Sequence, residues 1–142
     1  MKRICVIDGQ GGGIGATVIK KLKERYGETV EIIALGTNAI ATAQMLKARA
    51  NRGASGENAI VQTVKRIDII IGPIGIIMAH SFMGEVTPKM AEAVAASPAK
   101  KLLIPLSQER IEIIGTAAIP LPKLVEELIA KHLIHLIDII EE

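Results

Sequence analysis

The sequence predicts an α/β fold: a single Rossmann-like doubly wound domain on a mainly parallel sheet of about five strands. Two observations predict it. Short apolar runs rich in β-branched residues alternate along the chain with segments of helical periodicity. The first run is followed at once by DGQGGGIG, residues 8–15, which places five glycines in eight positions where a strand turns into a helix. A chain of 142 residues has the usual size of one domain, so we expect one domain over residues 1–142.

The first half of the chain supplies two strands and two helices. Arg3–Ile7 is apolar and β-rich, and the segment 17–27 after the glycines has the spacing of an amphipathic helix. A second strand is expected over Thr29–Gly36. A second helix follows over Asn38–Ala50, with its first residue, an asparagine, as the N-cap. The glycine-containing stretch 51–57 is expected to be a linker.

The second half continues the alternation. A helix over Glu57–Arg66 leads into the continuous apolar run Ile67–Gly72, which is typical of a strand covered on both faces. A helix opened by a threonine and a proline is expected over Thr87–Ser97, followed by a strand over Lys100–Leu106. A last strand is expected over Arg110–Thr116. Because about three residues are too few for a parallel crossover, this last pair should form an antiparallel hairpin at the sheet edge.

From Pro120 onward we expect one long C-terminal helix. Its polar positions recur every three or four residues and almost all the others are apolar. This stripe is wider than one sheet face requires, so part of it is expected to pack against another copy of the chain in a homo-oligomer, most simply a dimer. The stripe comprises Leu124, Val125, Leu128, Ile129, Leu133, Leu136, Ile137 and Ile140.

The glycine-rich turn is the strongest functional signal. Glycines let the backbone approach a phosphate closely, and the following helix presents free N–H groups and partial positive charge to it. The turn fits the dinucleotide pattern GxGxxG/A through Gly11, Gly13 and Ala16, and it also fits the variant GxxxGxG. The residues expected to bind the ligand are Asp8, Gly9, Gln10, Gly11, Gly12, Gly13, Ile14, Gly15, Thr37, Asn38, Gly72, Pro73 and Gly75.

A second glycine turn, GPIG at residues 72–75, follows the third predicted strand. If the four main strands lie in the order 2-1-3-4, it faces the first turn across the crevice. If the order is 3-2-1-4, the end of the fourth strand near Leu106 and Ser107 takes that place. We favour the first order.

The sequence points to a nucleotide without specifying a reaction. The second strand ends in LGTN, with no acidic residue placed for an adenosine ribose and no arginine for a 2′-phosphate. The Tyr and Lys pair of short-chain dehydrogenases is absent, because Tyr26 has Val30 four residues on. A P-loop is disfavoured because Ala16 stands where its lysine belongs. The expected cofactor is therefore NAD(P) or another nucleotide.

Composition and charge exclude several partners. The net charge is +2, with 17 basic and 15 acidic residues interspersed, and aromatic residues are limited to Tyr26 and Phe82. A nucleic-acid partner is not expected, since the sequence has neither a continuous basic block nor aromatic stacking platforms. Its apolar segments are too short or too interrupted for a signal peptide or a membrane span, so we expect a cytoplasmic protein without a membrane partner.

The sequence gives only weak signals for a reactive thiol, a catalytic base and nucleophile, or a metal site. Cys5 is expected to be a small buried hydrophobe. His80 and Ser81 are adjacent and lack an orienting third group, so they make a poor base and nucleophile. His132, His135 and Asp138 drift around the helix and lack a fourth ligand, so no metal site is expected.

Six segments together resemble a known family: VIDGQGGGIG, IIALGTNAIAT, GASGENAI, IDIIIGPIGII, GEVTPKMAEAV and KKLLIPL. They cover about Met1 to Leu106. The family comprises short bacterial proteins and is known only as domain of unknown function 3842. The resemblance implies a Rossmann-like fold and assigns no activity.

These observations favour a small nucleotide-binding protein with the phosphate at the first glycine turn. Two alternatives stay open. One is a homo-oligomeric scaffold whose glycines only permit close packing. The other is an enzyme that acts on a small anionic metabolite.

Overall fold

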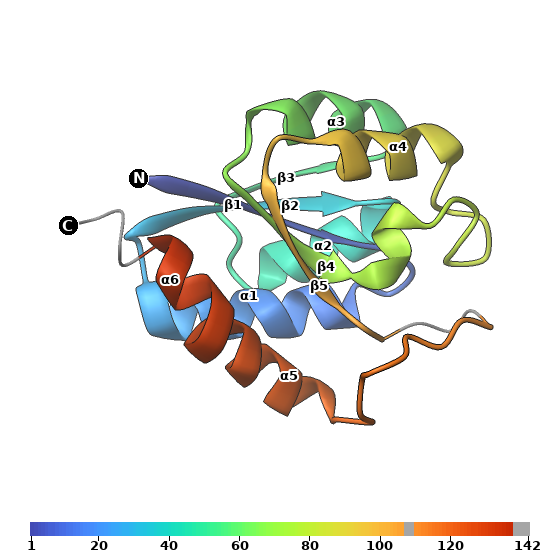
Figure 1. Ribbon diagram of the computed structural model, residues 1–142. Coiled ribbons are helices and arrows are strands. Elements are labelled where there is room, and N and C mark those ends of the chain that lie inside the picture. Colours follow the sequence, from blue (N-terminus) through green and yellow to red (C-terminus); the bar gives the residue numbers. More distant parts are fainter. Residues whose placement is uncertain (107–109, 138–142) are drawn as a thin grey trace.

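The computed structural model describes residues 1–106 and 110–137 and shows a three-layer α/β domain (Figure 1). Five parallel strands form one sheet in the order β3-β2-β1-β4-β5. The strands are β1 (Lys2–Asp8), β2 (Val30–Gly36), β3 (Arg52–Ser55), β4 (Ile69–Pro73) and β5 (Lys100–Ile104). The winding reverses between β1 and β4, so the carboxyl ends of these two strands flank the switch point at which doubly wound sheets bind ligands.

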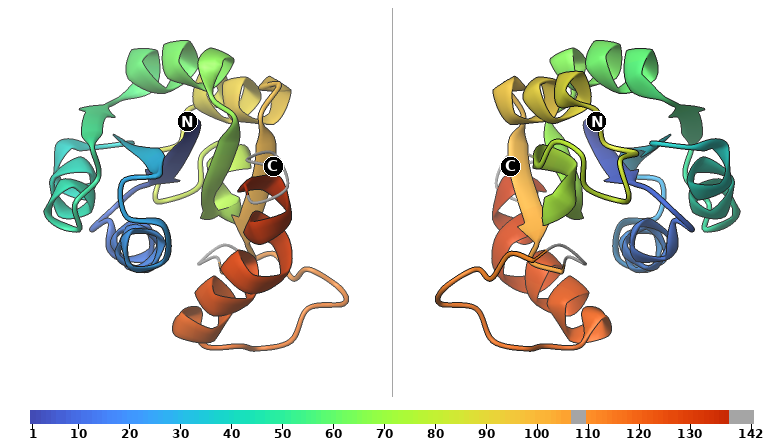
Figure 2. Two further views of the ribbon diagram at one scale, coloured as in Figure 1. Left: turned by 90° about the vertical axis from the view of Figure 1, so that its left-hand side faces the viewer. Right: turned by 90° about the vertical axis from the view of Figure 1, so that its right-hand side faces the viewer.

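Helices cover both faces of the sheet. One face carries α1 (Gly13–Tyr26), α2 (Ala39–Lys47) and the C-terminal helical segment, and the other carries α3 (Glu57–Thr63) and α4 (Pro88–Ala96) (Figure 2). Short 3₁₀ turns at η1 (Val64–Arg66) and η2 (Ile74–Ile77) flank β4. The C-terminal segment consists of α5 (Leu121–Glu127), a π-helical stretch (Leu128–Leu133) and α6 (Ile134–Ile137).

The central strands alternate between two hydrophobic cores, as the two-residue period of a strand requires. In β1, Ile4 and Val6 pack with α1 and the C-terminal helices, whereas Cys5 and Ile7 pack with α3 and α4. Because both faces are covered, these strands are apolar at nearly every position. Burial raises the pKa of the Cys5 thiol far above its ordinary value, so this cysteine is a core residue as expected.

Two helix starts confirm the capping signals in the sequence. The Asn38 side chain accepts a hydrogen bond from the Ala41 amide at 2.8 Å, and Thr87 accepts one from the Met90 amide at 3.2 Å. Pro88 then occupies the first turn of α4, where its missing N–H has no consequence.

The fold class is confirmed, whereas the antiparallel edge hairpin is wrong. Residues 110–116 are exposed and form no strand, and 107–109, which include Ser107, lie outside the described residues. The fifth strand is β3, within the stretch 51–57 expected to be a linker; all four of its residues are exposed, so it has no apolar pattern to detect. Among the four main strands of the prediction, the favoured order 2-1-3-4 is confirmed.

The wide stripe of the C-terminal helix packs largely within the chain. Val125, Leu128, Leu133 and Ile137 are buried in the core shared with α1 and the sheet. Leu124, Ile129 and Leu136 are partly buried against the same core, and Ile140 lies outside the described residues. The stripe therefore gives no separate reason for a second copy of the chain.

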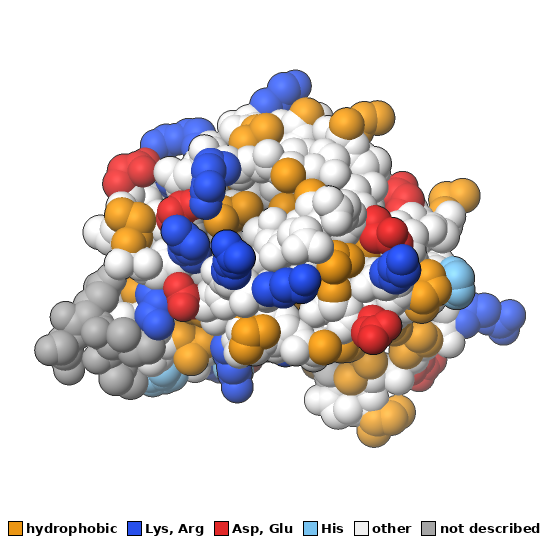
Figure 3. Space-filling model, turned by 90° about the horizontal axis from the view of Figure 1, so that it is seen from above, with side chains coloured by type: hydrophobic (Ala, Val, Ile, Leu, Met, Phe, Trp, Pro, Cys, Tyr) orange, Lys and Arg blue, Asp and Glu red, His pale blue; other side chains and the backbone are white. Residues whose placement is uncertain are grey.

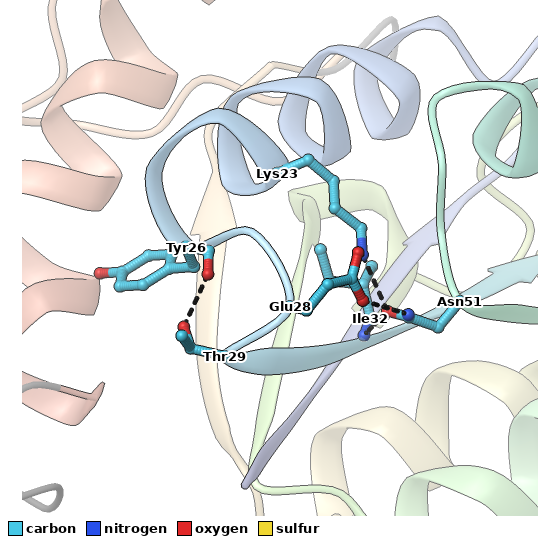
Figure 4. Close-up of polar contacts among 6 residues, drawn as sticks. All are labelled: Lys23, Tyr26, Glu28, Thr29, Ile32 and Asn51. Carbon is cyan, nitrogen blue, oxygen red and sulfur yellow. Dashed lines mark hydrogen bonds and ion pairs between the residues drawn. The ribbon is translucent and has the colours of Figure 1, made fainter.

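A buried lysine secures the turn between α1 and β2 (Figure 4). The Lys23 side chain is 5% exposed and reaches Glu28 at 3.3 Å and the Asn51 side-chain oxygen at 3.1 Å. That same oxygen accepts a hydrogen bond from the backbone amide of Ile32 at 2.8 Å. The backbone amide of Asn51 in turn donates a hydrogen bond to the Ile32 carbonyl, also at 2.8 Å. The charge is thus paired and hydrogen-bonded, as a buried ammonium requires.

The surface over α3 and α4 mixes both signs of charge. Lys and Arg side chains are interspersed there with Asp, Glu and hydrophobic side chains (Figure 3). Within residues 1–106 and 110–137, no helix is long and apolar enough to cross a membrane.

Candidate functional site

The glycine turn borders a crevice at the carboxyl ends of β1 and β4. The crevice has a volume of about 370 Å³ and lies at the point where the winding of the sheet reverses. Its walls are formed by Asp8, Gly9, Gln10, Gly11, Gly12, Gly13, Ile14, Pro73, Phe82 and Leu106. The structure therefore brings one residue of the GPIG turn, Pro73, beside the first glycine turn.

The inner amides of the turn are occupied by the protein's own carboxylate. Asp8 is 4% exposed, and its two oxygens accept the amides of Gly9 at 2.8 Å and Gly15 at 2.7 Å. Burial raises the pKa of this carboxyl, the amides of the turn oppose that effect, and the nearby charge of Glu85 adds to it. The N-terminus of α1 thus already faces an anion, and Gly9 and Gly15 have no amide to offer a ligand.

A second carboxylate reaches the turn from residues 78–86, which we call the cover loop. One Glu85 oxygen, Oε1, accepts hydrogen bonds from the Gln10 amide at 2.8 Å, the Thr37 hydroxyl at 2.6 Å and the Asn38 side-chain amide at 2.9 Å. Burial raises the pKa of Glu85, but these three hydrogen bonds together outweigh burial and leave the pKa below its ordinary value. Glu85 is therefore ionised at neutral pH.

Thr37 and Asn38 hold this carboxylate. The hydroxyl of Thr37 donates a hydrogen bond to Glu85. The side-chain oxygen of Asn38 caps α2, and its side-chain NH₂ group donates hydrogen bonds to Glu85 and, at 3.0 Å, to the Gln10 carbonyl. The two residues follow β2 as expected, and they join the end of β2 to the glycine turn through a residue from a distant loop.

The five glycines of the turn separate into two groups. An added Cβ at Gly9 would lie 2.5 Å from Phe82, and one at Gly15 would lie 2.5 Å from the sulfur of Met45. Gly12 has φ +73° and lies against the backbone of Ala41, where an added Cβ would be 2.8 Å from the Ala41 Cα. These three glycines are required by packing and backbone conformation, as the alternative of a purely structural turn proposes.

Neither packing nor backbone conformation requires a glycine at position 11 or 13. Both are exposed, and an added Cβ at either would meet no atom within 4 Å. In the described part of the chain, no acceptor contacts the amide of Gly11 or of Gly13. Gly13 is the first residue of α1, whose leading N–H groups have no partner within the helix. Two amides therefore remain available beside the crevice.

The glycines of the GPIG turn serve packing. An added Cβ at Gly72 would overlap the Ile7 carbonyl oxygen, and one at Gly75 would lie 2.6 Å from the Phe82 ring. The Ser81 hydroxyl donates to the carbonyls of Gly75 and Met78, and His80 is exposed. Ser81 therefore fastens the cover loop, and it is not oriented toward His80 as a nucleophile.

Glu85 is the residue that sequence reasoning missed. It lies 75 positions from Gln10 in the sequence and is not next to a predicted strand end. The segment GEVTPKMAEAV contains it, but the family resemblance assigns it no role. A local signal is its glycine neighbour in the stretch FMGEV, which marks a loop. Among the described residues, no three His, Cys, Asp or Glu side chains are grouped so that they could hold a metal ion.

The fold and the turn define a Rossmann-like domain whose glycine turn is held by two carboxylates. By its sequence the chain belongs to the family described as Domain of unknown function (DUF3842), whose model matches residues 3–136. No curated protein matches the chain. Among solved structures, a dodecameric FMN-dependent UbiX-like decarboxylase from Escherichia coli O157:H7 is 14% identical, with a TM-score of 0.44 over 100% of this chain and 95% of that chain.

Proposed function

We propose that this protein binds a nucleotide in the crevice between β1 and β4, with a phosphate group against the amides of Gly11 and Gly13. The observation that carries the proposal is the exposure of these two glycines. Neither needs to be glycine for packing, both line the crevice at the switch point of the sheet, and among the described residues the amide of neither has an acceptor. A glycine without a structural reason is best explained by the close approach of a ligand.

The sugar and base of the nucleotide are then expected along the same edge of the sheet. A dinucleotide such as NAD(P), or a mononucleotide, has a phosphate that fits this position. Pro73 and Leu106, in the wall of the crevice, supply apolar contact area for an uncharged part of the ligand.

Substitution of Gly13 by valine tests the proposal. Position 13 is exposed and an added Cβ meets no atom within 4 Å, so the variant is expected to fold, and the β-branched side chain obstructs the approach of a phosphate to the amides. A thermal-shift titration with NAD, NADP, ADP, ATP, GTP and FMN should show stabilisation of the natural sequence by at least one of these nucleotides, and the Gly13→Val variant should lose it. Ala95→Val, an exposed position of α4, is the matched control and should keep it. Unchanged stabilisation of Gly13→Val would refute the phosphate contact.

We also propose that the protein forms a homo-oligomer, on different grounds from the helical stripe. Residues 110–116 carry the exposed apolar side chains Ile111, Ile113 and Ile114, with exposures of 47%, 37% and 91%. A neighbouring copy would cover them. Light scattering after size exclusion should give a mass that is a multiple of 15.1 kDa, and a monomer at micromolar concentration would contradict this assembly.

A further inference from the structure

Three hydrogen-bond donors from separate parts of the chain meet at one point. They are the Gln10 amide in the glycine turn, the Thr37 hydroxyl after β2 and the side-chain amide of Asn38, at 2.8, 2.6 and 2.9 Å from the Glu85 Oε1. Convergent donors of this kind form an anion site, because each N–H or O–H dipole directs its positive end at the same place. In this structure the anion is a carboxylate of the same chain.

The position of this anion adjoins the proposed ligand site. Gln10, whose amide Glu85 accepts, directly precedes Gly11, whose amide is exposed. The Glu85 oxygen also lies 2.9 Å from where a Cβ on Gly9 would be, so Glu85 lies directly over the turn. A ligand phosphate at Gly11 and Gly13 would therefore have the Glu85 carboxylate as its neighbour.

Charge makes it unfavourable for the two anions to occupy the turn together. Asp8 already places one buried carboxylate under the turn, and the charge of Glu85 raises the pKa of Asp8. A ligand phosphate would bring further negative charge to the same few ångströms, where the low dielectric strengthens repulsion. Departure of Glu85 both removes that repulsion and frees three donors.

The base and the tip of the cover loop are held by different contacts. The base is fixed by the buried Ser81 and Val86, whose backbones hydrogen-bond to each other at 3.2 Å. The tip holds Phe82 and Met83 at positive φ, a conformation that side chains rarely adopt, and Met83 is 92% exposed. The tip contacts the turn through Phe82, which packs on Gly9, and through Glu85.

We propose that Glu85 is an internal ligand of an anion site formed by Gln10, Thr37 and Asn38, and that the cover loop opens so that a phosphate group takes its place. This inference rests on the proposed function, because the incoming phosphate is assigned to the nucleotide. It adds a regulatory element: the closed loop lowers the apparent affinity by the fraction of molecules that are open.

The test compares binding of two probes, inorganic phosphate and ADP, by isothermal titration calorimetry. Glu85→Ala removes the internal ligand, and Glu92→Ala removes the same charge from an exposed position of α4. If the loop is open in about one molecule in ten or fewer, Glu85→Ala should bind both probes about tenfold more tightly or better, whereas Glu92→Ala should match the natural sequence. Glu85→Gln keeps the shape of the side chain with a weaker acceptor, so its affinity for the probes should lie between those of Glu85→Ala and the natural sequence. It provides a second variant if alanine impairs folding.

Loop opening has its own reporter. The chain contains no tryptophan, so Met83→Trp at the exposed tip gives a fluorescence signal from the cover loop alone. We expect this signal to change on addition of phosphate or ADP with the same midpoint as calorimetry.

Equal or weaker binding of both probes by Glu85→Ala overturns the inference. An internal ligand competes with the phosphate, so its removal must tighten binding, whereas removal of a residue that contacts the phosphate weakens binding. Tighter binding of phosphate with no binding of ADP by any variant supports the anion site and removes the nucleotide function. ADP binding that Glu85→Ala leaves unchanged keeps the nucleotide function and removes the role of Glu85. Binding of neither probe by any variant overturns both.

Discussion

Gly12 and Gly13 are neighbours in the sequence, and the structure predicts opposite effects for the same substitution at the two positions. At Gly12, alanine must adopt φ +73°, which costs about 1–2 kcal/mol in the left-handed region. Its Cβ would also lie 2.8 Å from the Cα and from the carbonyl oxygen of Ala41, which are backbone atoms that do not move aside freely. Overpacking of this kind costs about 1–3 kcal/mol, so Gly12→Ala should destabilise the protein by about 2–5 kcal/mol in total.

At Gly13 the added methyl group has open space and the backbone is already helical. Replacement of glycine by alanine in a helix favours folding by up to about 1 kcal/mol. At roughly 3 °C per kcal/mol, Gly12→Ala should lower Tm by about 6–15 °C, while Gly13→Ala should leave Tm unchanged or raise it by up to about 3 °C. Differential scanning calorimetry of the two variants measures this directly. Similar losses in both variants would refute the separation of the glycines into packing and ligand-binding positions.

Two further predictions concern stability. Asn51→Ala removes the acceptor of the Ile32 amide and one of the two acceptors of the Lys23 ammonium, which keeps Glu28. The unsatisfied amide should destabilise the protein by about 1–3 kcal/mol in urea denaturation, and a loss below about 0.5 kcal/mol would contradict the role of this cluster. The pKa of Glu85 is lowered in the folded state, so its ionised side chain contributes to the free energy of unfolding. That contribution is fully present above the ordinary glutamate pKa of 4.5 and is lost as the pH falls below it. Between about pH 5 and 3 the natural sequence should therefore lose stability faster than Glu85→Gln, and parallel pH profiles of unfolding would show that the three hydrogen bonds do not favour the ionised form.

The parts of the fold that sequence reasoning predicted rest on local signals. Asn38 and Thr87 are capping residues at the start of good helix formers, and both caps are present. The apolar run at β4 reads as a buried strand without any knowledge of its partners. The β3 strand has no such signal, because its pairing with β2 depends on backbone hydrogen bonds and its four side chains are exposed.

The segment 110–116 shows the opposite error. Its alternating apolar residues have strand propensity, but propensity forms a strand only where a sheet edge pairs with it, and in this chain the segment is exposed. The candidate site divides in the same way. The turn and its crevice follow from residues 8–15, whereas the occupation of Gln10, Thr37 and Asn38 by Glu85 depends on a contact across 75 positions at its longest.

The most direct measurement for the central claim is a titration of ¹⁵N-labelled protein with ADP, followed by amide chemical shifts in two-dimensional NMR spectra. The account predicts the largest changes at the amides of Gly11 and Gly13, with Gln10 changing as Glu85 leaves it and Gly15 held by Asp8. Saturable shifts confined to other parts of the chain, with Gly11 and Gly13 unmoved, would contradict it.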